Sequence, residues 1–175
     1  MKKDENLKLI MIASMIVLAA ATRFLPTAPN FTPMIAIALF GGAMIKNKYM
    51  AAALPLSAML LSDIFIGFHS TIPAVYLSIV LAIFAGRMIK NNKNILNIAG
   101  GSLISAVLFF LITNFGAWLA IGTYTKDLAG LMQAYQMGIP FFRNTILSTG
   151  LFSTALFGAY ALVEKFIPEL DTNKA

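Results

Sequence analysis

Long apolar runs separated by short polar stretches divide the chain into six segments. A helix needs about 20 apolar residues to cross a bilayer, and most of the runs approach that length. The second run is shorter, but Thr32 and Pro33 precede it as an N-cap hydroxyl and a proline suited to the first helical turn. The pattern therefore predicts an all-α integral membrane bundle of six transmembrane helices, a single domain over residues 1–175. The expected spans are residues 7–21, 33–45, 49–68, 72–89, 95–121 and 141–167.

The composition supports a membrane location and excludes several kinds of chemistry. Apolar residues make up 59% of the chain and charged residues 11%, whereas a soluble domain carries about 25% charge. The chain has no cysteine and one histidine, so we expect no disulfide, no metal site and no cofactor. It contains no phosphate-binding loop, and Asp63 is the only acidic residue inside a predicted span. An aspartyl protease needs two such carboxylates, and we expect the protein not to be an enzyme.

Basic residues are distributed unevenly along the predicted topology. Lysine and arginine are retained on the cytoplasmic side of a membrane, which makes their positions an orientation signal. Three basic residues, Arg23, Lys126 and Arg143, fall on one side. The others all fall opposite: Lys2, Lys3, Lys8, Lys46, Lys48, Arg87, Lys90, Lys93, Lys165 and Lys174. This asymmetry predicts that both termini are cytoplasmic, and it gives no reason to expect a nucleic-acid partner.

The outer side then holds the long connection at residues 122–140. Leu128, Leu131, Met132 and Tyr135 lie near helical spacing within it, so we expect an amphipathic or re-entrant cap on the outer surface.

Polar side chains at membrane depth cluster toward the same outer side. Ionisable groups inside a membrane are costly and usually face a cavity or a partner, which suggests one shared pocket. Helix N-termini attract anions, and we expect three of them there, capped by Thr32, by Thr71 with Pro73, and preceded by Pro140. Asp63 can neutralise only one of Arg23 and Arg143, so the predicted ligand is anionic. The candidate substrate-binding residues are Arg23, Asn30, Asp63, His69, Asn114, Trp118, Tyr135, Arg143 and Asn144.

A structural interpretation competes with this pocket. Asp63 with Arg23 or with Arg143 can form an ion pair that only fixes helix positions. Several helices also carry small residues four apart, a spacing that lets helices pack closely in lipid. We expect internal packing at Ala38 and Gly42, Ala82 and Gly86, Gly101 and Ser105, and Gly150, Thr154 and Gly158.

Several motifs of this outer cluster resemble a family of small bacterial membrane proteins of unknown function. The motifs are Arg23-Phe24-Leu25-Pro26, Pro29-Asn30-Phe31-Thr32-Pro33, Ala38-Leu39-Phe40-Gly41-Gly42-Ala43, Leu61-Ser62-Asp63, Gly67-Phe68-His69, Thr113-Asn114-Phe115-Gly116 and Ile139-Pro140-Phe141-Phe142-Arg143-Asn144-Thr145.

The chain is more distantly similar to the substrate-binding S components of energy-coupling factor vitamin transporters. That similarity implies a subunit that captures a small molecule and works alone or with a transmembrane coupling protein and separate ATPase subunits. The chain departs from those proteins in two places. It lacks the cysteine of the cobalamin-transporting type, and it carries Ala13, Val17 and Ala21 where an A-x-x-x-A pattern often faces the coupling protein.

Together these observations predict a small-molecule binding subunit in the lipid bilayer, involved in uptake of a small anionic or vitamin-like solute from the outside. The alternative is a structural or accessory membrane protein with a stabilising ion pair and no transported substrate.

Overall fold

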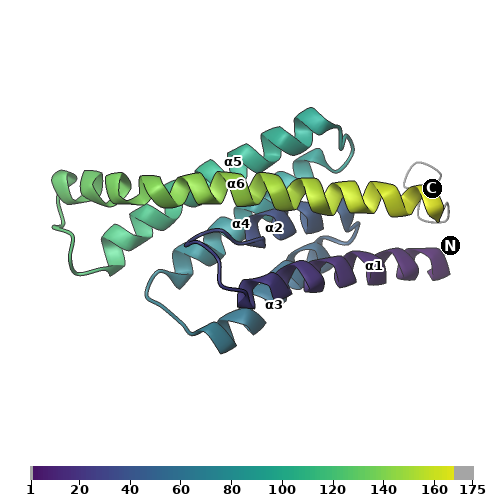
Figure 1. Ribbon diagram of the computed structural model, residues 1–175, viewed down its shortest axis with the longest axis horizontal. Helices are drawn as coiled ribbons and strands as arrows, with labels where there is room; N and C mark the ends of the chain where they lie inside the picture. The colour runs from purple at the N-terminus through teal and green to yellow at the C-terminus, as the bar shows by residue number, and fades with distance from the viewer. Residues whose placement is uncertain (1, 168–175) are drawn as a thin grey trace.

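A computed structural model describes residues 2–167, and within them every regular element is helical (Figure 1). Five of the helices are long and apolar enough to cross a membrane, which is consistent with the predicted multi-pass helical bundle. The elements in chain order are α1 (Lys2–Ala21), the 3-10 turn η1 (Thr22–Phe24), α2 (Met34–Met44), α3 (Lys48–Ile66), α4 (Ile72–Ile89), α5 (Ile95–Ala120) and α6 (Leu128–Phe166).

The short helix α2 forms the centre of the bundle. All 11 of its residues are buried, and it contacts each of the other five helices. At 1.5 Å per residue it is about 16 Å long, roughly half the thickness of a bilayer core. The second apolar run therefore forms a buried core helix that is too short to cross a membrane. Its N-cap is Pro33, with no side-chain cap bond, so the expected capping role of Thr32 is wrong.

Glycines allow α2 to pack tightly against α4. A Cβ atom added to Gly42 would collide with the carbonyl oxygen of Ile83, and one added to Gly86 would collide with that of Leu39. The predicted close packing at these two small-residue motifs is confirmed. The small-residue motif on α6 behaves differently, because a Cβ atom at Gly150 or Gly158 would meet nothing within 4 Å.

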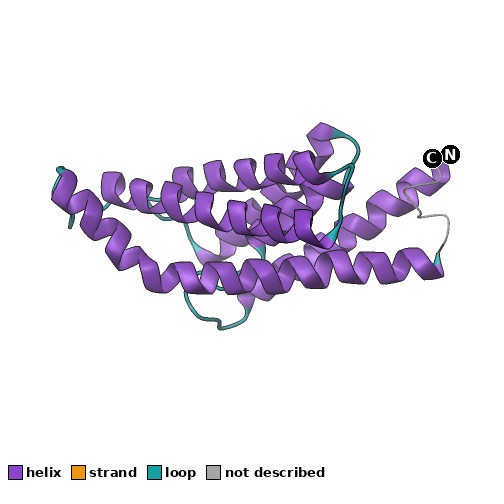
Figure 2. Ribbon diagram, turned by 90° about the horizontal axis from the view of Figure 1, so that it is seen from above, coloured by secondary structure: helices purple, strands orange, loops and turns teal. Residues whose placement is uncertain are grey.

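Helix α6 is much longer than predicted. It has 39 residues, about 58 Å, and begins at Leu128, with Asp127 as an N-cap whose side chain accepts a hydrogen bond from the Gly130 N–H at 2.8 Å. Residues 128–140 are thus the first third of α6 and not a separate cap. Pro140 lies inside the helix, where it bends α6 (Figure 2) and does not start it. The start of α6 and the end of α5 reach beyond α1 and α3 (Figure 1).

One end of the bundle gathers the basic residues. Arg87 Nη1 donates to the carbonyl oxygens of Ile45 at 2.6 Å and Lys46 at 3.2 Å, which joins the end of α4 to the end of α2. Lys46 Nζ also lies 3.2 Å from a carboxylate oxygen of Glu5 near the start of α1. We call this the basic end, and its described basic residues follow helices or lie at their ends: Lys8, Lys46, Lys48, Arg87, Lys90, Lys93 and Lys165. Lys174 lies outside the described residues.

Candidate functional site

A buried ion pair joins η1 to α3. Arg23 Nη1 lies 2.9 Å from Asp63 Oδ1, and the two side chains are 11% and 2% exposed. Asp63 therefore pairs with Arg23, which decides between the two partners that the sequence left open. The same Nη1 atom also lies 3.4 Å from the Met59 carbonyl oxygen and contacts the Ser62 hydroxyl.

Tyr76 on α4 completes this cluster. Its hydroxyl donates to Asp63 Oδ2 at 3.0 Å, so both carboxylate oxygens have a partner. The Ser62 hydroxyl is tied to its own helix through the carbonyl oxygens of Ala58 at 2.9 Å and Met59 at 2.8 Å. The cluster is electrically neutral, and the buried Nε atom of Arg23 has no hydrogen-bond partner in the described structure. Such a cluster can hold three elements in place, and it has little charge left to offer a ligand.

A second group of predicted residues joins α5 to α6 beyond this pair. The Asn114 side chain donates to the Phe110 carbonyl oxygen at 2.8 Å and lies against Gly138, where a Cβ atom would collide with it. The Tyr135 hydroxyl donates to the carbonyl oxygen of Leu111 at 2.9 Å. These contacts hold the first third of α6 against α5.

Trp118 and the connection before α6 form a third group. The indole N–H donates to the Thr125 carbonyl oxygen at 2.8 Å, and Lys126 Nζ lies 5.7 Å from the ring centroid. Lys126 also donates to the carbonyl oxygens at the end of α5, among them that of Leu119 at 3.2 Å. The indole and the lysine thus close the α5–α6 connection.

Asn144 holds the extended segment before α2 against α6. Its side chain donates to the Pro29 carbonyl oxygen at 2.9 Å, and Ser148 donates to that of Asn30 at 3.4 Å. Asn30 adopts a φ of 61°, a left-handed conformation that asparagine tolerates better than most residues. The turn at Asn30 therefore directs the chain into the core helix α2.

His69 and Arg143 are both exposed and lie apart from these groups. His69 Nδ1 lies 2.8 Å from the Thr71 hydroxyl, and Thr71 makes no side-chain cap bond to α4. The prediction that the Thr71 hydroxyl caps α4 is therefore wrong, although Pro73 does lie in the first turn of that helix. The third expected N-terminus, after Pro140, does not exist, because α6 begins at Leu128 and Asp127 caps it. Three free helix N-termini therefore do not meet at one anion site.

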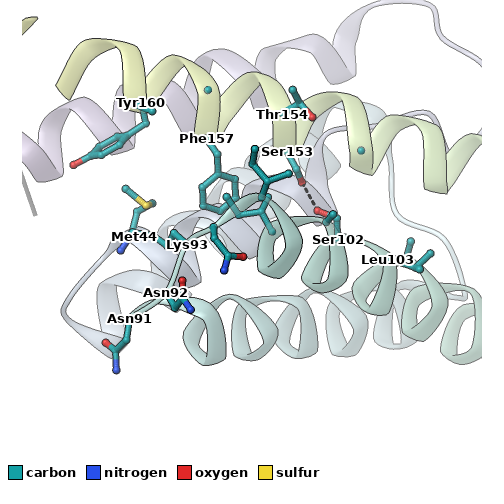
Figure 3. Close-up of a pocket in the computed structure, with 18 of the residues that line it drawn as sticks. Met44, Asn91, Asn92, Lys93, Ser102, Leu103, Ser153, Thr154, Phe157 and Tyr160 are labelled. Atoms are coloured by element: carbon teal, nitrogen blue, oxygen red, sulfur yellow. Dashed lines mark hydrogen bonds between the residues drawn. The ribbon is translucent and has the colours of Figure 1, made fainter. Parts of the chain in front are cut away.

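A large cavity lies elsewhere, between α5 and α6 toward the basic end (Figure 3). Its volume is about 800 Å³, and none of the nine candidate residues lines it. Phe157 points into it from α6 and packs on Phe40 of α2, with ring centroids 5.1 Å apart. The buried hydroxyls of Ser102 and Ser153 bond to each other at 2.9 Å across the wall.

Missing side chains on α6 leave this space open. Gly150, Thr154 and Gly158 line it at four-residue spacing, and a Cβ atom at either glycine would meet nothing within 4 Å. The prediction of internal packing for this motif is wrong, because the glycines border a cavity. The motif was visible in the sequence, but the same spacing also marks close packing on α2 and α4.

A smaller recess of about 320 Å³ adjoins the cavity at the basic end. Four lysines from three parts of the chain line it, namely Lys8, Lys46, Lys90 and Lys93. The recess and the cavity share Met44, Asn91 and Lys93 as lining residues, so they adjoin each other, and we call the two together the depression. In the sequence these lysines serve only as an orientation signal, and no pattern there shows that they converge on one recess.

The described residues hold no group of three or more His, Cys, Asp or Glu side chains that could bind a metal ion. The lining of the depression offers apolar contact, amide and hydroxyl hydrogen bonds, the positive charge of its lysines and the carboxylate of Glu164.

Comparison with known proteins gives one match. A model of a family of unknown function, DUF6580, matches residues 3–170. The chain belongs to this family. No curated protein and no solved structure matches it. The match agrees with the expected membership in a family of unknown function, and nothing in it links the chain to S components.

Proposed function

We propose that this DUF6580 protein is a membrane-embedded binding protein that holds a small molecule in the cavity between α5 and α6 and takes part in its transport. The observation that carries the proposal is the cavity itself. Its volume of about 800 Å³ falls within the range of small-molecule sites, and its walls combine apolar side chains with few polar groups. Those polar groups include Ser102, Ser153 and the asparagines after α4.

The position of the cavity changes where we place the ligand. The sequence predicts an anionic or vitamin-like solute bound from the outside, whereas this cavity lies toward the basic end, beside Asn91, Asn92 and Lys93. We place that end and both termini in the cytoplasm of a bacterial cell, because basic residues are retained there. The protein is then a multi-pass inner-membrane protein whose ligand site lies in the inner half of the bilayer.

The energy for transport would come from outside this chain. The sequence contains no phosphate-binding loop for a nucleotide. A transmembrane coupling protein with separate ATPase subunits, as the similarity to S components implies, is our proposed partner if transport is active. The exposed side of α1, which includes Val17 at 61% exposure, is available for such a contact.

Native mass spectrometry of the detergent-purified protein tests the binding function. We expect a copurified small molecule in the wild type and its loss in Gly158→Leu, because the new side chain would extend into the cavity. Gly100→Leu is the matched control: a Cβ atom there also meets nothing within 4 Å, but Gly100 does not line the cavity. Loss of the molecule in both variants, or in neither, would contradict a site between α5 and α6.

A second function is favoured by the neutral Arg23–Asp63–Tyr76 cluster. In this cluster the charges of Arg23 and Asp63 neutralise each other. Such an arrangement suits an accessory membrane protein whose polar residues only hold helices together. In that case no molecule copurifies and Gly158→Leu leaves the protein's behaviour unchanged, while Asp63→Ala lowers its stability.

A further inference from the structure

The lysine recess and the α5–α6 cavity adjoin each other and have opposite chemistry. The recess presents four ammonium groups, while the cavity is bordered mainly by apolar side chains and glycines. Met44, Asn91 and Lys93 belong to both parts, so a single molecule can occupy them together. Such a molecule needs a charged head and an apolar tail.

Charge at this end determines the sign of the head. Two described acidic groups lie nearby: Glu5, whose carboxylate is 3.2 Å from Lys46 Nζ, and Glu164, which lines the cavity. Lys93 Nζ donates to the Lys90 carbonyl oxygen at 2.6 Å, which keeps its charge at the mouth of the recess. Four lysines against two carboxylates leave an excess of positive charge, and the head is therefore an anion.

The walls of the cavity show from which side the tail enters. Ile95 and Leu103 of α5 are 84% and 52% exposed, and on α6 Gly150, Thr154 and Gly158 are exposed as well. Each of these residues lines the cavity. The cavity is thus open along the flank of the bundle, the surface that faces lipid when the helices span a membrane. A ligand entering there comes from the bilayer and not from water.

We propose that this depression binds an anionic phospholipid of the cytoplasmic leaflet, with its phosphate in the lysine recess and an acyl chain between α5 and α6. Basic pockets between helices on the cytoplasmic side are suited to anionic head groups. The inference rests on the proposed function, since it names the ligand class of the same cavity. It adds the requirement that binding depends on the lysines and on head-group charge.

The test uses the purified full-length protein in nanodiscs of phosphatidylcholine mixed with phosphatidylglycerol, followed by native mass spectrometry of the lipid that stays bound after transfer to detergent. We expect phosphatidylglycerol to be retained over phosphatidylcholine. The double variant K90Q/K93Q should retain it about 25-fold less tightly, from about fivefold for each lysine near a membrane surface. K48Q is the matched control, because Lys48 is a lysine of the same end that does not line the recess.

Two outcomes would overturn the lipid assignment. The first is equal retention of the two lipids, or equal loss in K48Q and K90Q/K93Q. The second is displacement of the bound lipid by millimolar inorganic phosphate, which would identify a soluble anion as the ligand. If a molecule is bound and is lost in G158L but not in K90Q/K93Q, the cavity function stands and only the lipid assignment fails. If nothing binds in any of these proteins, both proposals fail.

Discussion

Removal of the Asp63 carboxylate is the most informative perturbation of the fold. Asp63 is 1% exposed, and the variant Asp63→Leu leaves the Arg23 guanidinium buried without its counter-ion. Breaking a buried pair in this way costs about 3–5 kcal/mol. The Met59 carbonyl oxygen and the Ser62 hydroxyl still accept from Arg23, so we expect a loss of about 3 kcal/mol in the free energy of unfolding. The lost hydrogen bond of Tyr76 adds about 1 kcal/mol.

The reverse variant should be at least as damaging. Arg23→Met leaves Asp63 with Tyr76 as its remaining side-chain donor, and the Asp63 side chain is the more deeply buried of the two. The double variant Arg23→Met with Asp63→Leu removes both charges, and we expect it to be within about 1 kcal/mol of the wild type because apolar replacements of buried pairs are often neutral. Each single variant then loses about 4 kcal/mol and the double variant about 1 kcal/mol or less, so the coupling energy between the two sites is about 7 kcal/mol.

Reversible unfolding of the detergent-solubilised protein, followed by far-ultraviolet circular dichroism, measures the four proteins of this cycle. A double variant as unstable as the sum of the single variants would refute the reasoning, because it would mean that the two side chains act independently. Single variants that lose less than about 1 kcal/mol would refute it as well, since an uncompensated buried charge cannot be so well tolerated.

Three further predictions concern other parts of the molecule. Gly86→Ala should destabilise the protein by 2 kcal/mol or more, on the order of a severe core overpacking, because the Cβ atom would meet the α2 backbone; thermal unfolding measures it. Gly150→Ala should instead stabilise it by up to about 1 kcal/mol in the same assay, since the position is helical and the space is open. Hydrogen bonds from the Gly130 N–H and the Thr125 hydroxyl hold the pKa of Asp127 below its ordinary value of 3.8. Because the folded pKa is the lower one, this cap stabilises α6 above the ordinary pKa and its contribution is lost as the pH falls through the folded value; Asp127→Asn should remove that part of the acid dependence of the melting temperature.

Much of the fold could be predicted from the apolar runs. The expected spans at residues 49–68 and 72–89 lie within two residues of α3 and α4 at each end, because apolar length and flanking polar residues determine where such helices stop. The second run was predicted as a transmembrane span, but it forms the buried core helix α2. Its burial depends on contacts with five other helices, which the apolar pattern of one segment does not show. The predicted start of α6 was wrong because Pro140 was taken as a helix boundary. A proline inside a long helix can bend the helix without ending it.

The candidate site was predictable in its residue types and not in its arrangement. Asp63 was expected to pair with an arginine, but the choice of Arg23 depends on how η1 returns to α3, which no local pattern encodes. The cavity was beyond prediction for a similar reason. Small residues four apart on α2 meet a neighbouring backbone, while Gly150 and Gly158 meet none, and only the positions of the other helices distinguish the two cases.

An experimental density map of the protein in lipid nanodiscs tests the central claim most directly. We expect non-protein density in the α5–α6 cavity, beside Ser102 and Phe157 and continuing toward Lys90 and Lys93, and we expect it to be absent in Gly158→Leu. A map in which α5 and α6 pack directly against each other, with no density between them other than protein, would contradict the claim that this protein binds a small molecule there.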